Sequence, residues 1–168
     1  RGREAEVLHG DAREVGYGGR FDAVLTSPPY PGLIDYHEQH RYAYELLGLP
    51  DRRVEEIGAA AQGRTRPAIR AYVDGMVAAL SNVAGQLPPG APIVIVVNDS
   101  RDLYPEILDR VGLRLVERST RHVNRRTGRR AGEFFEDVLV CRAADGSARP
   151  GRTRRSRGLE GPAPAVGG

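Results

Sequence analysis

Ile93-Val94-Ile95-Val96-Val97 is an unbroken run of β-branched residues in this 168-residue chain. Such a run is typical of a strand that is covered on both faces, as in a parallel sheet whose strands are linked by helices. Before it, apolar residues recur at helical spacing over residues 69–87, and Pro88-Pro89-Gly90 ends that pattern. A helix that leads directly into a buried strand predicts an α/β fold.

The segments on either side extend the alternation of strands and helices. Apolar patterning predicts strands over residues 6–9, 21–25, 113–120 and 137–141, a helical stretch over 34–49, a connecting excursion over 51–67 and a short helix over 103–111. This order predicts an α/β layer fold that ends in an antiparallel pair of strands.

Length and composition predict one domain followed by a tail. A chain of this length supports one hydrophobic core, which we place in residues 1–142. Residues 143–168 are dominated by Gly, Pro, Ala, Ser and Arg, so burial there would not offset the entropy of ordering, and we expect a disordered tail. Arginine supplies all 25 basic residues, and its planar fork suits phosphate.

Cysteine and histidine usage exclude several kinds of site. The single Cys141 rules out an intramolecular disulfide and favours a reducing, cytoplasmic location, where we expect a buried, inert thiol. His37-Glu38-Gln39-His40 lacks the histidine spacing of a zinc protease helix, so we predict no metal and place these histidines beside the site. The longest aliphatic run, residues 93–97, is far shorter than the roughly 20 apolar residues that span a bilayer, so we expect no membrane role.

Thr26-Ser27-Pro28-Pro29-Tyr30 follows the predicted strand over residues 21–25. Two consecutive prolines fix φ, lack N–H groups and keep Ser27 out of the helical region, so this loop is stiff. The carbonyls of Ser27 and Pro28 can then act as acceptors, and an exocyclic amine would satisfy them. Tyr30 offers an aromatic face for a base that has been rotated out of a duplex. The alternative is a simple turn after a strand, which proline commonly makes.

Two further polar segments follow predicted strands, at Asp11 and at Asn98-Asp99-Ser100. Ligands of open α/β sheets bind beyond the carboxyl ends of the strands, so we expect all three segments to meet at one edge. An Asx turn is an equally good interpretation of Asp11. For Asn98-Asp99-Ser100, a turn that caps the next helix is the better interpretation.

Together these segments resemble the amino-group DNA methyltransferases over residues 5–142. Thr26 to Tyr30 is similar to their Pro-Pro-aromatic motif, and a leading Ser resembles the cytosine-N4 subgroup. Gly10-Asp11-Ala12 resembles the motif whose acidic side chain contacts the cofactor adenine, and Phe134 to Val140 resembles a late motif of an aromatic residue and a strand. The resemblance implies a Rossmann-like class I sheet, of which this chain is the C-terminal part with the terminal antiparallel hairpin.

The resemblance also implies a reaction and its residues. S-adenosylmethionine would donate a methyl group to the N4 amine of a cytosine flipped out of double-stranded DNA. Ser27, Pro28, Pro29 and Tyr30 would be catalytic, and Asp11, Ala12 and Thr26 would bind the cofactor. The glycine-rich loop that holds the cofactor's methionine in this family is not found in the chain. We expect an upstream segment or a partner chain to supply it.

Alternatives stay open. Similar Pro-Pro-Tyr loops occur in enzymes that methylate adenine N6 in DNA, guanine N2 in RNA or glutamine in proteins, usually with Asp or Asn in the first position. A catalytically silent nucleic-acid-binding fragment would fit the missing glycine-rich loop and the abundant arginines. The modified nucleoside would separate the enzymes from one another, and cofactor binding would separate them from the fragment.

Residues 118–130 hold six arginines and one histidine with no acid. Arginine meets phosphate oxygens bidentately, and such contacts position a duplex without reading its sequence. A solvated loop is the alternative. We predict that DNA phosphates contact five of these arginines: Arg121, Arg125, Arg126, Arg129 and Arg130.

Overall fold

A computed structural model of the chain describes residues 5–123 and 134–143. Its centre is a mixed sheet of four strands in the order β1-β2-β4-β3. The strands are β1 (Val24–Thr26), β2 (Pro92–Val97), β3 (Leu113–His122) and β4 (Phe135–Ala143). β1 and β2 are parallel, whereas β4 runs antiparallel to both β2 and β3. The predicted α/β fold with an antiparallel terminal pair is confirmed.

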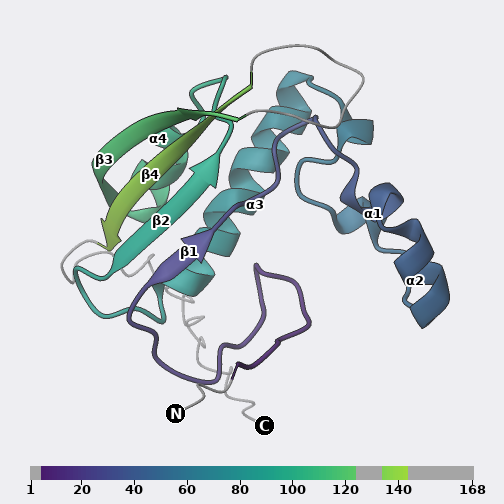
Figure 1. The fold of residues 1–168 in the computed structure, drawn as a ribbon, viewed down its shortest axis with the longest axis horizontal. Helices are drawn as coiled ribbons and strands as arrows, with labels where there is room; N and C mark the ends of the chain where they lie inside the picture. The colour runs from purple at the N-terminus through teal and green to yellow at the C-terminus, as the bar shows by residue number, and fades with distance from the viewer. Residues whose placement is uncertain (1–4, 124–133, 144–168) are drawn as a thin grey trace, which may run out of the picture.

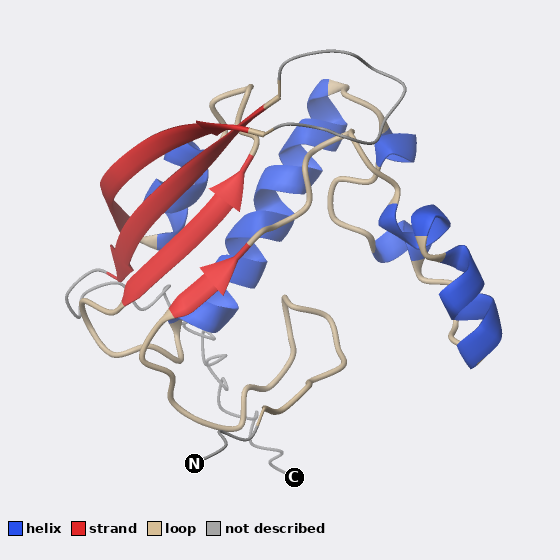
Figure 2. Cartoon of the chain, in the orientation of Figure 1, coloured by secondary structure: helices blue, strands red, loops and turns tan. Residues whose placement is uncertain are grey.

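The helices flank one face of the sheet and extend away from it. The α-helices of the described residues are α1 (Tyr36–Gln39), α2 (Arg41–Leu47), α3 (Arg66–Ala84) and α4 (Tyr104–Val111). Two short 3-10 turns, Arg53–Glu55 and Ala60–Gln62, lie between α2 and α3. In Figures 1 and 2, α3 and α4 lie behind the sheet, while α1 and α2 project to one side. The connection from α2 to α3 therefore starts far from the sheet and returns to it.

Helix α3 forms where its sequence signals predicted it. Thr65 caps its first turn by accepting from the Ala68 N–H at 3.4 Å, and Pro67 lies in the first turn, where a helix needs no N–H donor. Its buried side chains, spaced three and four apart, are Tyr72, Val73, Met76 and Leu80. These side chains pack the helix against the sheet.

Strand β2 alternates between the two faces of the sheet. Ile93, Ile95 and Val97 are completely buried in the core shared with α3 and α4. Val94 and Val96 point to the other face and are half-buried. Among the described residues, the strand is therefore completely covered on one face, as predicted, and only partly covered on the other.

Three sequence predictions were wrong in detail. Residues 6–9 form no strand, and Val7 is 92% exposed, because no neighbouring strand among the described residues pairs with this segment. The strand predicted over residues 21–25 shortens to Val24–Thr26, the part that pairs with β2. The helical stretch over 34–49 is interrupted at His40, whose φ of −104° and ψ of 15° lie outside the helical region.

Residues 1–4, 124–133 and 144–168 lie outside the described residues, and so does nearly all of the predicted tail. Its first residue, Ala143, instead ends β4. Cys141 is fully buried, which confirms the expectation of a buried thiol, and burial raises the pKa of that thiol to about 11. Over residues 5–123 and 134–143, none of the helices is long and apolar enough to cross a membrane.

Candidate functional site

The loop from Thr26 to Tyr30 leaves the carboxyl end of β1 and is anchored by a side chain of α3. Pro28 is buried, and the Tyr72 hydroxyl donates to the Pro29 carbonyl at 3.0 Å. Tyr72 Oη also lies 3.3 Å from Tyr104 Oη. Ser27 is exposed, and no side chain of the described residues donates to the Ser27 or Pro28 carbonyl. The loop is thus fixed at Pro29, while Ser27 stays accessible.

Tyr30 is held rigidly by β4. Its ring is only 9% exposed, and its hydroxyl donates to Glu136 Oε1 at 2.7 Å. The other oxygen of Glu136 accepts from Arg121 at 2.6 Å, and the Phe134 ring lies 6.0 Å from the Tyr30 ring. Burial, followed by the bond to Glu136, raises the pKa of Tyr30 to about 12, against a smaller opposite effect of Ser27. Tyr30 is therefore a neutral, immobilised ring at physiological pH.

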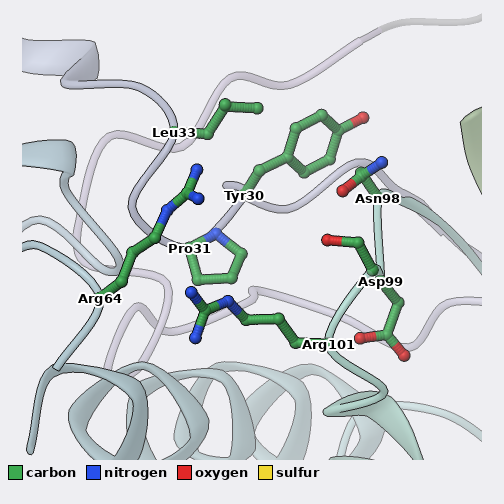
Figure 3. A pocket seen from close by; sticks show the side chains of 8 residues that line it. Tyr30, Pro31, Leu33, Arg64, Asn98, Asp99 and Arg101 are labelled. Atoms are coloured by element: carbon green, nitrogen blue, oxygen red, sulfur yellow. The ribbon is translucent and has the colours of Figure 1, made fainter. Parts of the chain in front are cut away.

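A narrow cavity of about 60 Å³ lies beside Tyr30, between the ends of β1 and β2. Figure 3 shows the side chains of Arg64 and Arg101 reaching into the space beside Pro31, opposite Asn98 and Tyr30. Both arginines are exposed side chains, so the cavity can widen without any change in the backbone. The polar segments after β1 and β2 therefore meet at one edge, as predicted.

The segment after β2 mostly serves the fold. Asp99 Oδ1 accepts from the Leu103 N–H at 2.7 Å, and Asp99 Oδ2 accepts from the Tyr104 N–H at 3.1 Å. Asn98 donates to the Phe135 carbonyl at 2.7 Å and so ties the end of β2 to β4. Burial raises the pKa of Asp99, against the opposing effect of the two N–H groups. The interpretation of Asn98-Asp99-Ser100 as a turn and helix cap is confirmed for Asp99.

Asp11 forms the predicted Asx turn. Its Oδ1 accepts from the Arg13 N–H at 2.9 Å, and the Arg13 guanidinium pairs with both carboxylate oxygens. These bonds lower the pKa of Asp11 to about 2. Asn82 of α3 donates to the carbonyls of Ala12 and Val15 at 3.1 and 3.0 Å, which fastens the turn to the rest of the fold.

A larger open cavity of about 340 Å³ brings Asp11 and Ala12 to the same place as Pro29. Tyr36, His37 and Tyr44 also line it, so His37 lies at the same cavity as Asp11. The His37 ring lies 4.0 Å from the Tyr44 ring, and its Nε2 lies 3.2 Å from Asp51 Oδ1. Thr26, predicted to bind the cofactor, is half-buried in β1 and is not among the residues that line this cavity.

In the described part of the segment predicted to contact DNA, acidic side chains of β4 neutralise the charge of the arginines. Arg121 pairs with Glu136, directly opposite it in the ladder, and Arg118 donates to Asp137 at 2.8 Å. Arg121 is still 61% exposed. The other four predicted contacts, Arg125, Arg126, Arg129 and Arg130, lie outside the described residues.

Sequence reasoning missed Glu136, which links Tyr30 to Arg121 across β4. The sequence did indicate which face Glu136 lies on. Side chains alternate between the two faces of a strand, so Glu136 lies on the face opposite the buried Asp137. A pattern in one strand does not reveal which side chain of a distant loop lies opposite, so Glu136 could not be connected with Tyr30 before the fold was known.

Comparison with known proteins identifies a relative. Over 120 residues the chain is 42% identical to the Type II methyltransferase M.MjaII of Methanocaldococcus jannaschii. The chain is a relative of a Type II methyltransferase. The match includes 71% of this chain and 23% of that protein, so the chain spans less than a quarter of the relative's length. No protein-family model matches the chain. This match confirms the resemblance to DNA-modifying methyltransferases of Type II, but it does not identify which base is methylated.

Solved structures that match the chain do so only in part, with TM-scores below 0.5. TTHA0409 of Thermus thermophilus, a presumed DNA modification methylase, is 24% identical, with 87% of this chain and 57% of that chain covered and a TM-score of 0.46. TrmN of Thermus thermophilus is 18% identical, with 81% and 27% covered and a TM-score of 0.40. A methyltransferase of Pyrococcus furiosus is 16% identical, with 76% and 43% covered and a TM-score of 0.33.

Proposed function

We propose that the chain forms the target-base half of a DNA methyltransferase, located in the cytoplasm, that modifies the N4 amine of cytosine. The observation that carries this proposal is the loop from Ser27 to Tyr30. It follows the carboxyl end of β1, its Pro29 carbonyl is fixed by Tyr72, and its Ser27 is exposed. Similarity to the Type II methyltransferase of Methanocaldococcus jannaschii supports methyl transfer as the reaction.

Ser27 and Pro28 would orient the amine. The exocyclic nitrogen of cytosine is a poor nucleophile because its lone pair is delocalised into the ring. Two acceptors on its N–H bonds, the Ser27 hydroxyl oxygen and the Pro28 carbonyl, favour a more pyramidal nitrogen with a more available lone pair. The rigid loop holds these acceptors before the substrate arrives, so little reorganisation is needed during the reaction.

Tyr30 would stack against the flipped base. Its ring cannot rotate away, because Glu136 holds the hydroxyl at 2.7 Å and Phe134 packs beside it. The raised pKa keeps the hydroxyl protonated, so the ring carries no charge that would repel DNA. A fixed aromatic surface of this kind lowers the entropy cost of holding an unstacked base.

The cavity beside Pro29 would hold the adenosine part of S-adenosylmethionine, which supplies an electrophilic methyl group when bound. Its lining fits that group through aromatic surface, since Tyr36 and Tyr44 can pack against adenine. The Asp11 carboxylate already accepts two contacts from Arg13 on each oxygen, so it would accept from the cofactor in exchange for one of these. Thr26, which does not line this cavity, would support the loop from β1 and not contact adenine.

The test is incorporation of labelled methyl groups from S-adenosylmethionine, measured on DNA and on RNA with this chain and with the full-length gene product that carries it. We expect label in DNA. Label in RNA alone would move the substrate to the guanine-N2 alternative. No label in either, combined with retained DNA binding, would favour a catalytically silent fragment.

A matched pair of serine variants sharpens the test. Ser27→Ala removes a hydroxyl beside the proposed amine position, whereas Ser81→Ala removes an exposed hydroxyl on the far part of α3. We expect about a tenfold lower rate for Ser27→Ala, the size of one lost hydrogen bond in a transition state. We expect no change for Ser81→Ala. Equal rates for the two variants would remove Ser27 from the mechanism.

A further inference from the structure

A cavity of about 380 Å³ lies where the start of α3 meets α4, and it adjoins the narrow cavity at Tyr30. The two cavities share Arg64 and Arg101 as lining residues, and together we call them the groove. Five arginines line the outer part of this groove: Arg64, Arg66, Arg70, Arg101 and Arg110. They come from the loop before α3, from α3 itself, from the loop after β2 and from α4, and only the fold brings them together.

Most of this positive charge is not neutralised by neighbouring acids. Arg110 pairs with Asp74 at 2.8 Å and with Glu106 at 3.5 Å. Within residues 5–123 and 134–143, the ion pairs involve none of the other four arginines of the groove. Arg118 and Arg121, by contrast, are paired with acids of β4. The groove, which Glu106 also lines, therefore holds four arginines without an acidic partner, whereas Arg118 and Arg121 are both paired.

The backbone also favours an anion here. The groove begins at the N-terminus of α3, a helix of 19 residues whose dipole places partial positive charge at this end. Arg66 and Arg70 lie one turn apart on that helix and so face the same side. Ile69 and Val73 form an apolar floor between the charged residues.

A tight turn keeps Arg64 beside the loop that bears Tyr30. Gly32 has a φ of +65°, and its N–H donates to the Gly58 carbonyl at 2.9 Å. A Cβ at Gly32 would lie 2.9 Å from the Gly63 carbonyl oxygen and 3.0 Å from Arg64 Cγ. Only glycine permits this close approach, so the position of Arg64 at the junction of the two cavities is built into the turn.

We infer that this arginine groove binds the phosphates of the DNA strand that carries the target base, directly beside the base. The inference rests on the proposed function for the identity of the polymer. Guanidinium forks bind phosphate oxygens bidentately, and the four arginines without acidic partners offer contacts to more than one phosphate. Contacts of this kind would hold the strand on the Tyr30 side of the protein, with the flipped base entering between Arg64 and Arg101.

The experiment compares two double variants of the chain in a DNA-binding titration over a range of salt concentrations. Arg66→Gln with Arg70→Gln removes two groove charges, and Arg20→Gln with Arg114→Gln removes two exposed charges elsewhere. All four side chains are exposed, and thermal melting of each variant checks that the fold is retained. For the groove variant, we expect the slope of log K against log salt to become shallower by about 0.9 for each phosphate that the protein no longer neutralises.

The control variant should keep the slope of the unchanged chain. Equal slopes for the groove variant and the control would overturn the inference. Methyl transfer, measured in parallel on the same samples, keeps the two proposals apart. A shallower slope for the groove variant, together with no methyl transfer even by the unchanged full-length gene product, would leave the groove in place and refute the proposed function. Normal methyl transfer with an unchanged slope would refute the groove alone.

Discussion

The loops after β1 and β2 occupy equivalent places at the carboxyl edge of two parallel strands, yet they use their polar groups differently. Asp99, after β2, uses both carboxylate oxygens to accept from the first N–H groups of α4. The loop after β1 instead receives its support from outside, since Tyr72 of α3 donates to Pro29 and Glu136 of β4 accepts from Tyr30. Ser27 is thereby left exposed.

The difference shows how a site can be recognised among strand ends. Polar residues that satisfy their own backbone contribute to stability and are not available to a ligand. A loop stiffened by prolines and anchored by distant hydroxyl groups keeps its own polar groups for a substrate. We therefore expect substitutions after β1 to change activity more than stability, and substitutions after β2 to do the reverse.

Tyr30→Ala should have the largest effect and would test the first half of this contrast. Loss of base stacking should lower the methyl transfer rate about 100-fold, since stacking on an aromatic ring is worth about 1–3 kcal/mol per base. Removal of a buried ring should also destabilise the chain by about 3 kcal/mol. Steady-state rates at a temperature where the variant is folded would measure the first effect. Tyr30→Phe, which keeps the ring, is the control, and an Ala variant as active as the Phe variant would refute stacking.

Asp99→Ala tests the other half. It removes both bonds that cap α4, and we expect a loss of about 1–2 kcal/mol of stability with little change in rate per folded molecule. Urea denaturation would measure the loss, and Asp109→Ala, an exposed acid on the same helix, is the matched control. A stable Asp99→Ala protein with no activity would contradict this contrast, because the loop after β2 would then serve activity and not stability.

Tyr72→Phe should have an intermediate effect on both properties. It removes the donor to the Pro29 carbonyl, which should lower stability by about 1 kcal/mol and kcat severalfold, with little change in KM. Tyr104→Phe interrupts the hydroxyl pair but leaves the bond to Pro29 intact. If both variants lower kcat equally, Tyr72 acts through general packing and does not position the loop.

Asp11 should have the smallest effect on stability, and that effect should depend on pH. Its pKa is lowered from 3.8 to about 2 in the folded chain by Arg13, so its contribution is present above about pH 4 and is lost as the pH falls towards 2. Thermal melting of the chain and of Asp11→Asn between pH 5 and 2 should show a difference that fades at the acid end. A difference that grows as the pH falls would contradict the assigned ion pair.

The parts of the fold set by local patterns were predictable. The β-branched run of β2, the apolar spacing of α3 and the glycine after α4 each specify their element with little help from elsewhere. Residues 6–9 have the composition of a strand, but a strand also needs a pairing partner, and none is found among the described residues. A local pattern cannot supply that information.

The candidate site was predictable where its chemistry lies in one segment. The loop from Ser27 to Tyr30 is recognisable by its two prolines and its aromatic residue. The arginine groove was not predicted. Residues 64–70 hold three of its arginines, but only the fold shows that they lie beside Arg101 and Arg110. Conversely, the run that includes Arg118 and Arg121 looked unpaired in sequence, yet the antiparallel register places acids of β4 opposite it.

The central claim is that this site methylates an exocyclic amine of DNA, and nucleoside analysis tests it most directly. DNA would be incubated with labelled S-adenosylmethionine and the full-length gene product, digested to nucleosides and resolved by chromatography with mass detection. The account predicts label in N4-methylcytosine that is lost in the Tyr30→Ala variant. Label on a ring carbon, or label that survives unchanged in that variant, would contradict it.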